Sequence, residues 1–247
     1  MIDVNLFTAP IALDRNTHRS ARLHTPTVRF DRTAKMNAMF VAAAEFGDVC
    51  REYPIVFVDA GPGANGTREV APMAVFGLGA GENLMLNADG SWDARYAPAL
   101  LRGYPVGLAR TGDDQYAVVI DADANALSET EGERLFDDAG EPSEVLNQRR
   151  TYIEEFEREA QRTRAACQRL MELELLQPMR FDATLPDGKQ LAVDGFLAVN
   201  EERLAHLPDA TVVEMHRNGL MALVHAHQIS LPLMRQMVER RLARAVA

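Results

Sequence analysis

A long stretch with helical periodicity, from Pro142 to Gln177, constrains the fold of this chain more than any other feature. Its apolar residues recur every three or four positions, and Glu and Arg fill many of the positions between them. Those apolar residues are Leu146, Ile153, Phe156, Ala160, Cys167 and Leu170. Proline suits the first turn of a helix but cannot continue one, so Pro178 should end the stretch. We predict a helix over 142–177, about 54 Å long, whose narrow seam packs along one line on a neighbour or a partner.

The segment before this helix, residues 1–135, has the pattern of strands and tight turns. Short runs rich in β-branched and apolar residues predict strands at 54–58, 71–76, 83–87 and 116–120. Asp89-Gly90 closely follows the third run and is a strong signal for a hairpin turn. The sequence therefore predicts a mixed or antiparallel sheet with hairpins in the N-terminal half.

The segment after the long helix, residues 178–247, predicts a hairpin followed by helices. Arg180–Leu185 would pair with Lys189–Val193 across a second Asp-Gly turn. Asn218-Gly219 has the form of a helix C-cap, and Ser230 that of an N-cap. The predicted fold class is therefore α+β, and we expect residues 1–247 to form a single domain.

Composition limits the kinds of partner this chain can have. Its 36 acidic and 26 basic residues give a formal charge of −10, which on average repels nucleic-acid phosphates. The 2 cysteines are too few for a disulfide framework and favour a reducing compartment. The N-terminus lacks a Sec-signal pattern, and the most apolar window, Leu220–Met234, is too short and polar to span a bilayer. We expect a cytoplasmic protein that neither crosses a membrane nor binds nucleic acid.

Two motifs suggest ligand sites until their sequence context is considered. Gly61–Gly66 matches G-x-G-x-x-G after a predicted strand, but a dinucleotide site needs a helix next, and Pro72 lies in another predicted strand. Asp121–Asn125 begins like an EF-hand loop, but Ala126 and Gly132 stand where that loop needs Gly and Glu. At most a weak surface Ca²⁺ site remains, and we predict no cofactor.

The histidines and nucleophiles also form no recognisable site. His225 and His227 resemble a metal-binding pair, but residues two apart on a helix point in different directions. His216 lies at a spacing that matches no standard ligand set, so we interpret these residues as core or capping histidines and predict no metal. There is no G-x-S-x-G elbow, and neither cysteine has a known catalytic context. No catalytic residue is assigned, and the sequence favours a protein that is not an enzyme.

Several short phrases occur in a defined order along the chain. They are Arg51–Phe57, Gly81–Leu84, Asp89–Asp93, Tyr96–Ala99, Leu101–Pro105, Glu131–Phe136, Asn200–Glu202, Leu207–Asp209 and Ala226–Leu231. Together, over roughly residues 5–240, they resemble the SapC family of bacterial proteins. The chain departs from the family pattern at Asn200, where Asp is expected, and in a longer loop from Gly61 to Arg68.

The resemblance implies no established reaction. The family name is linked to a bacterial surface layer and is shared with an unrelated permease, which this chain cannot be because no segment can span a membrane. Relatives are often encoded beside flavin-dependent tryptophan halogenases, cupin-like proteins and outer-membrane receptors. The leading hypothesis is therefore a non-catalytic accessory or binding protein, whose long helix contacts a protein partner or a second copy of the chain.

Two alternatives remain open. One is an enzyme or small-molecule-binding protein with a pocket built from Trp92, Arg102, Tyr104 and His227. These residues would supply an aromatic wall, a bidentate anion donor and a titratable group. The other is a component of the surface layer, exported by a route other than Sec.

Overall fold

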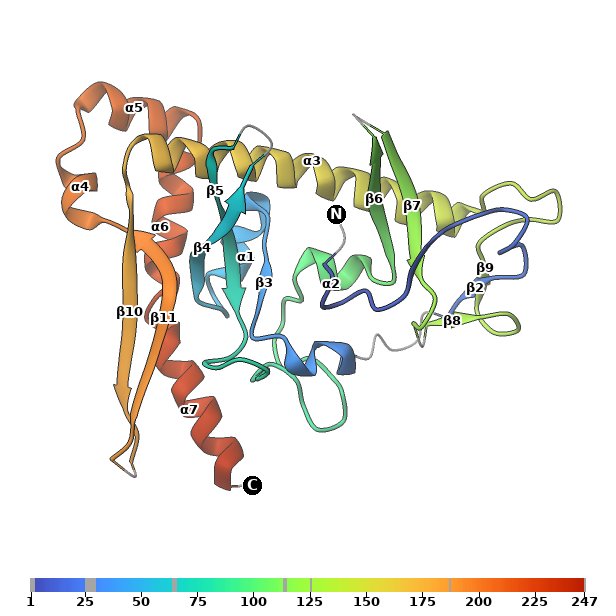
Figure 1. The fold of residues 1–247 in the computed structure, drawn as a ribbon, viewed down its shortest axis with the longest axis horizontal. Helices are drawn as coiled ribbons and strands as arrows, with labels where there is room; N and C mark the ends of the chain where they lie inside the picture. The colour runs from blue at the N-terminus through green and yellow to red at the C-terminus, as the bar shows by residue number, and fades with distance from the viewer. Residues whose placement is uncertain are drawn as a thin grey trace. The chain divides into compact units, whose positions relative to one another are not determined.

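The computed structural model describes residues 3–24, 30–63, 66–112, 115–124, 126–186 and 188–246 (Figure 1). The chain divides into two compact units, and the boundary falls inside the long helix α3 (Glu144–Glu172). Unit 1 comprises Met1–Ala34, Leu86–Trp92 and Ala99–Arg158. Unit 2 comprises Lys35–Met85, Asp93–Pro98 and Glu159–Ala247. Each unit is assembled from segments that are far apart in the sequence.

Unit 2 is built on a five-stranded antiparallel sheet with the strand order β10-β11-β4-β5-β3. The strands are β3 (Ala38–Phe40), β4 (Ile55–Pro62), β5 (Arg68–Val75), β10 (Leu176–Thr184) and β11 (Gln190–Val199). Most of β4 and β5 pair in a regular register, with one irregularity between Asp59 and Gly61. By contrast, β11 meets β4 at one Cα pair, Leu197 and Phe57. The two strands therefore share very little of a normal ladder.

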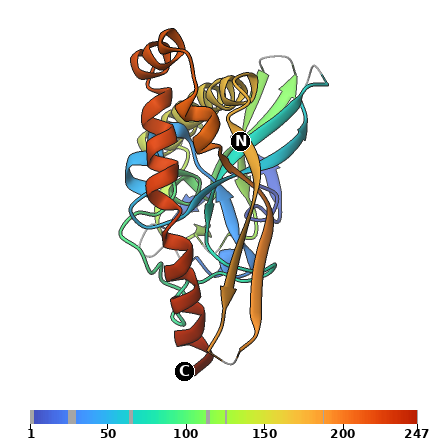
Figure 2. The same ribbon diagram turned by 90° about the vertical axis from the view of Figure 1, so that its left-hand side faces the viewer.

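The helices of unit 2 are η2 (Ala43–Glu45), α1 (Phe46–Val49), α4 (Glu201–Ala205), α5 (Asp209–Arg217), α6 (Leu220–Ser230), α7 (Leu233–Val246) and the second half of α3. Helices α3, α5 and α6 contribute buried apolar side chains to a core that they share with the sheet. Phe57 and Leu197 from the sheet meet Leu170 of α3 and Val224 of α6 in this core. Figure 2 shows α6 and α7 running beside the hairpin β10–β11.

Unit 1 contains two small antiparallel sheets and the first half of α3. One sheet has the order β1-β7-β6 and the other the order β8-β2-β9. Their bounds are β1 (Pro10–Ala12), β2 (Arg22–Leu23), β6 (Val106–Gly112), β7 (Gln115–Asp121), β8 (Leu127–Ser128) and β9 (Glu133–Arg134). The short helices are η1 (Asp31–Lys35), which crosses the unit boundary, and α2 (Ala99–Gly103). Leu135, Ile120 and Leu146 lie in the core of this unit.

The predicted α+β class, with antiparallel sheets, a long central helix and C-terminal helices, is confirmed. The long helix starts at Glu144 and ends at Glu172, earlier than the predicted end at Gln177. Pro178 does not end it but lies within β10, an edge strand, where a residue without an N–H can face outward. The predicted strand at 83–87 is instead a turn with an isolated bridge between Leu86 and Trp92.

Some sequence features lie partly outside the described residues. Ala64 and Asn65 belong to the glycine-rich loop, Asn125 to the acidic stretch after β7, and Asp187 to the turn between β10 and β11. The hairpin β10–β11 itself is present, with Phe181 opposite Val193.

The basic residues near the C-terminus bind a loop of unit 2. Arg240 donates to the carboxylate of Asp93 and, at 3.2 Å, to its carbonyl oxygen. Arg244 donates to the carbonyl oxygen of Asn83 at 2.6 Å, and Arg241 forms an ion pair with Glu82 at 3.1 Å. In this arginine clamp, Arg240 and Arg244 donate to carbonyl oxygens, and Arg241 pairs with a carboxylate.

Removing one arm of the arginine clamp should destabilise the protein. We expect Arg240→Ala to lower the free energy of unfolding by about 1–2 kcal/mol, because a charged donor to both a carboxylate and a carbonyl is lost. Urea denaturation followed by circular dichroism measures the change. Arg235→Ala, at an exposed position on the same helix, is the matched control. Equal stabilities of the two variants would contradict a stabilising clamp.

Candidate functional site

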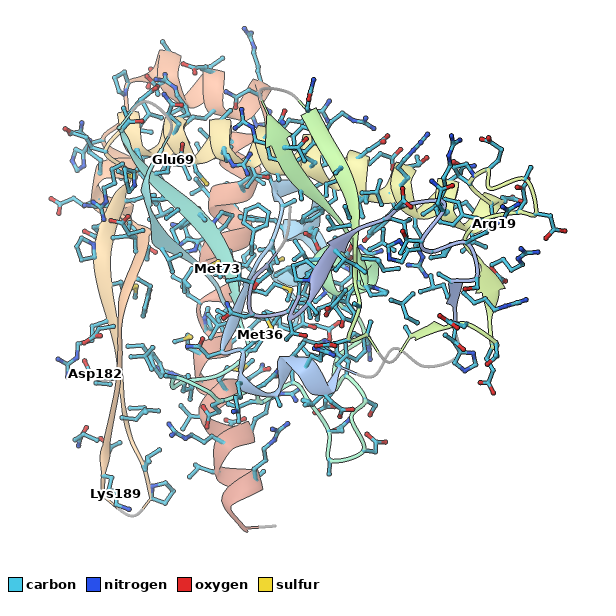
Figure 3. The ribbon with its side chains drawn as sticks, turned by 45° about the vertical axis from the view of Figure 1, so that its right-hand side comes forward. Arg19, Met36, Glu69, Met73, Asp182 and Lys189 are labelled. Atoms are coloured by element: carbon cyan, nitrogen blue, oxygen red, sulfur yellow. The ribbon has the colours of Figure 1, made fainter. Side chains whose placement is uncertain are left out.

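A groove of about 520 Å³ lies in unit 2 between the first part of β5 and the second half of α3. Ten residues line it: Thr67, Arg68, Glu69 and Val70 from the strand side, and Gln161, Arg164, Ala165, Gln168, Met171 and Glu172 from α3. Figure 3 shows Glu69 near the start of β5 and Met73 further along the same strand. The volume of the groove is in the range of about 300–1,000 Å³ that is usual for ligand sites.

The groove exists because β5 is paired unequally on its two edges. On one edge, β4 follows it from Ala74 to Arg68. On the other edge, β3 pairs only from Val75 to Met73, and the last hydrogen bond runs from the Val41 N–H to the Pro72 carbonyl oxygen at 3.2 Å. In the part of the chain that the structure describes, no strand continues this edge toward Arg68.

The opposite wall is a row of polar side chains on α3. Gln161, Arg164, Gln168 and Glu172 follow one another at spacings of three or four residues, so they share one side of the helix. The buried side of the same helix packs into the core through Cys167. Burial raises the pKa of the Cys167 thiol to about 12, so this residue acts as a neutral packing group.

A further contact fixes α3 to the sheet side of unit 2. The buried hydroxyl of Thr163 donates to the Glu159 carbonyl oxygen at 2.7 Å and accepts the backbone N–H of Ala43 at 2.8 Å. This pair of bonds joins the helix to the start of η2. The wall of the groove is therefore held by core packing and by a buried hydrogen bond on the same face of α3.

The groove carries charges of both signs above an apolar floor. Arg68 donates to Asp59 at 2.7 Å, and Glu172 accepts hydrogen bonds from Gln168 at 3.1 Å and Arg169 at 3.2 Å. Val70, Ala165 and Met171 supply the apolar surface. Such a lining has donors, acceptors and apolar contacts together.

Sequence reasoning did not find this groove. The polar residues of α3 were visible as one face of the predicted helix, but all exposed faces of such a helix look alike in sequence. The side that meets β5 is decided by which residues of α3 are buried against the sheet. The apolar seam, which contains Cys167 and Leu170, was the available signal, because the groove flanks it.

His227, one of the predicted site residues, is fully buried in unit 2. Its Nε2 atom accepts the backbone N–H of Val199 at 3.1 Å, and Nδ1 therefore carries the proton and donates to the Ile55 carbonyl oxygen at 2.8 Å. The ring also lies 5.2 Å from the ring of Phe57. The imidazole thus joins β11 to β4 from α6, as expected for a core histidine. The neighbouring His225 is exposed.

Burial lowers the pKa of His227 to about 4, although its bond to the Ile55 carbonyl opposes the shift. The unfolded chain takes up a proton on this residue near pH 6.5, whereas the folded chain resists it until about pH 4. The stability that the neutral ring provides is therefore complete above pH 6.5 and is lost progressively between pH 6.5 and pH 4.

We expect the free energy of unfolding to fall by about 2–3 kcal/mol between pH 7 and pH 4.5 through this residue alone. His227→Gln keeps a donor and an acceptor but cannot titrate. The fall in its free energy of unfolding between the two pH values should therefore be smaller than that of the wild type by this amount. Urea denaturation at the two pH values measures the difference, with His225→Gln as the matched control. If the free energy of unfolding of His227→Gln falls as much between the two pH values as that of the wild type, the buried ring does not cause the acid sensitivity.

Tyr104 belongs to a buried polar cluster in unit 1. Its hydroxyl donates to Asp121 at 2.7 Å, and Asp121 also accepts the backbone N–H groups of Ala9 at 2.8 Å and Thr8 at 3.3 Å. Arg32 lies 3.8 Å from the same carboxylate and donates to the Thr8 hydroxyl. Burial alone would raise the pKa of Asp121, but these donors and the Arg32 charge hold it below its usual value.

The same cluster explains the stretch that begins like an EF-hand. Asp123 accepts the Thr8 hydroxyl at 3.3 Å, and its carbonyl oxygen accepts Arg32. Burial and the neighbouring Asp121 raise the pKa of Tyr104, so its hydroxyl remains a donor. The acidic residues after β7 therefore hold residues 8–9 in place.

Trp92 and Arg102 are also in unit 1, each with different neighbours. Trp92 is half-buried, and its ring lies 5.3 Å from that of Phe30. Arg102 is exposed at the last turn of α2, with its guanidinium 5.7 Å from the centre of the Tyr152 ring. The cavity beside α2 has a volume of about 10 Å³, close to the size of one water molecule.

Of the four predicted site residues, Trp92, Arg102 and Tyr104 thus fall in unit 1 and His227 in unit 2. A pocket that uses them stays a prediction. Within the described residues there is no group of three or more His, Cys, Asp or Glu side chains that could hold a metal ion. Nor does any helix in that part of the chain have the length and apolar character to cross a membrane.

The fold is that of an α+β protein with a solvent-accessible groove lined by one helix and the start of one strand. The chain belongs to the SapC family, whose family model matches residues 13–237, and this confirms the resemblance seen in the sequence. All residues that line the groove fall within that range. No curated protein and no solved structure matches the chain.

Proposed function

We propose that this protein is an accessory binding protein that holds a segment of a protein partner in the groove between β5 and α3. The groove itself carries this proposal, because its lining combines apolar surface with charged side chains on both walls and amide side chains on α3. The lining residues on α3 belong to the helix that the sequence had suggested as the partner-binding element.

The chemistry of the buried polar groups supports a binding role. His227 bonds backbone groups with both ring nitrogens, and Asp121 is surrounded by donors from its own chain. Both groups thus contribute to stability. The groove presents its polar side chains at the surface, where a partner can reach Arg164 and Gln168.

The first candidates for the partner are the products of genes found beside relatives of this family, tryptophan halogenases and outer-membrane receptors. We propose a cytoplasmic location, for which two free thiols, Cys50 and Cys167, are the supporting observation. A second copy of the chain is the other protein that could occupy the groove.

The pair Arg164→Glu and Arg162→Glu tests the proposal. Both residues are exposed arginines on α3 and both substitutions change the net charge equally, but only Arg164 lines the groove. We expect Arg164→Glu to reduce the recovery of the partner at least tenfold, which corresponds to about 1.4 kcal/mol, and Arg162→Glu to retain it. The measurement is quantitative mass spectrometry after affinity purification of each variant from the native host.

Mass photometry of the wild-type protein separates the two kinds of occupant. A dimer that Arg164→Glu dissociates would identify the occupant as a second copy. A wild-type protein that is monomeric and recovers no partner, or a partner that Arg164→Glu retains fully, would contradict a binding role for the groove.

A further inference from the structure

We infer that the outer edge of β10 is a self-association surface, where the β10 strands of two copies of this chain pair antiparallel. The surface is separate from the groove and from α3, so the inference goes beyond the proposed function. Strand β10 stands last in the order of its sheet, and within the described residues no strand covers its outer edge (Figure 1). With nine residues, this edge is long enough to pair with another chain.

The hairpin β10–β11 extends beyond the rest of the sheet as an arm of two strands. Strand β11 meets β4 at one Cα pair, Leu197 and Phe57, and no described strand accompanies the hairpin from Phe181 and Val193 to its turn. Figure 3 shows Asp182 on the outer strand of this arm. A hairpin of two strands is marginally stable in water, and further strands stabilise it. Two arms joined through β10 would form a sheet of four strands.

The main-chain groups of three residues face the open edge of β10. Successive residues of an antiparallel strand direct their N–H and C=O groups to opposite edges. The Leu185 N–H donates to the Lys189 carbonyl oxygen at 2.8 Å, so Leu185 and the alternate residues before it face β11. The residues between them, Arg180, Asp182 and Thr184, therefore present their N–H and C=O groups to a partner.

Pro178 faces the same open edge, although the hairpin register shifts close to it. Met179 pairs with Phe196 and Phe181 pairs with Val193, so the extra residue of the bulge lies in β11. The alternation along β10 itself therefore continues through Met179 to Pro178. This position suits proline, because a residue without an N–H leaves no donor unpaired on an edge.

The charges of Arg180 and Asp182 select one register for the pairing. When Arg180 of one copy lies opposite Asp182 of the other, two-fold symmetry forms the same ion pair twice. Moving the symmetry axis by one residue would place Arg180 opposite Arg180 or Asp182 opposite Asp182, and like charges opposite each other are destabilising. In the selected register these residues supply about four main-chain hydrogen bonds. The Thr184 N–H groups donate about two more to the Pro178 carbonyl oxygens.

The ion pair within one copy leaves atoms for the second copy. The Arg180 Nε atom donates to Asp182 Oδ1 at 2.8 Å, and both side chains are more than half exposed. The Nη atoms of Arg180 and Oδ2 of Asp182 can therefore bond the same residues across the symmetry axis. An exposed pair of this kind contributes little on its own, so sharing it between two copies requires little energy.

The apolar face of β10 also gains contacts in this register. Met179 is 41% exposed, although helix α7 also contacts β10, and Phe181 and Ala183 are half-buried. These alternate residues share one face of the strand. The symmetry axis passes between the two Phe181 residues, and Met179 lies opposite Ala183 of the second copy, where side chains across an antiparallel pair are in contact. The pairing thus covers apolar surface and satisfies the edge backbone together.

Charge reversal tests the register on the full-length protein. We expect the wild type to form a concentration-dependent dimer in sedimentation equilibrium. Arg180→Asp makes both facing side chains acidic and Asp182→Arg makes both basic, so each variant should weaken the dimer about tenfold. An equimolar mixture of the two variants should recover wild-type affinity to within about threefold, because opposite charges then face each other again. Neither variant retains the ion pair within one copy, so the recovery reports contact between copies.

Disulfide trapping locates the symmetry axis. In a pair without mutual hydrogen bonds, opposite Cα atoms are about 4.5 Å apart, which a disulfide can span. Phe181→Cys should therefore form an intermolecular disulfide under mild oxidation, identified by mass spectrometry. Ala183→Cys is the matched control, because the two copies of residue 183 would lie about 13 Å apart along the strands. The wild type, with Cys50 and Cys167, reports disulfides that arise elsewhere.

Four results would overturn pairing through β10. They are a wild-type monomer at about 200 μM, single variants that dimerise like the wild type, a mixture that dimerises no better than its components, and trapping at residue 183 instead of residue 181. A dimer that Arg164→Glu dissociates and Arg180→Asp leaves intact would place the second copy in the groove. Recovery of a different partner tests the groove alone, so the proposed function and this inference can fail separately.

Discussion

The imidazole of His227 is the interaction on which the architecture of unit 2 depends. The ladder between β4 and β11 has a single Cα pair, Leu197 and Phe57, so the sheet is weakest at its middle. His227 bonds Val199 on one strand and Ile55 on the other, and Ser230 adds a bond from the Ile55 N–H at 2.8 Å. Helix α6 thus provides hydrogen bonds that a longer ladder would normally supply.

This arrangement links the core to the groove. The position of β5 is set by β4, and β4 is held to β11 through the ring of His227. The other wall, α3, is fixed by the core around Leu170 and by the Thr163 hydroxyl. The groove is therefore formed between two elements that share one core, and its polar side chains lie at the surface. Under the proposed function, a groove whose shape is already set by the core would require less ordering on binding.

The sequence predicted what local periodicity can reveal. The seam of α3, the hairpin β10–β11 and the strand at Ile55 follow from the spacing of apolar residues, and each is present. The position of Pro178 in an edge strand could not be predicted, because strand order is a property of the whole sheet. The role of His227 was outside the reach of pattern analysis for a similar reason: Ile55 and Val199 are distant in sequence and meet only in the fold. The groove depends on where β3 ends, at Phe40, and no local signal marks a strand that stops short of its neighbour.

The discontinuous composition of unit 2 has a consequence for the order of folding during synthesis. Residues Ala99–Arg158, most of unit 1, leave the ribosome before β10, β11 and α6 have been made. Until then, β4 lacks the ring of His227, and the segment around Asn83 and Asp93 lacks the arginine clamp from α7. Their apolar residues, such as Phe57, remain exposed while a later segment is translated, whereas the sheets of unit 1 can already close. A ribosome that pauses shortly after Arg158 would thus hold a chain with one folded unit and one incomplete sheet, the state most open to chaperones and to aggregation.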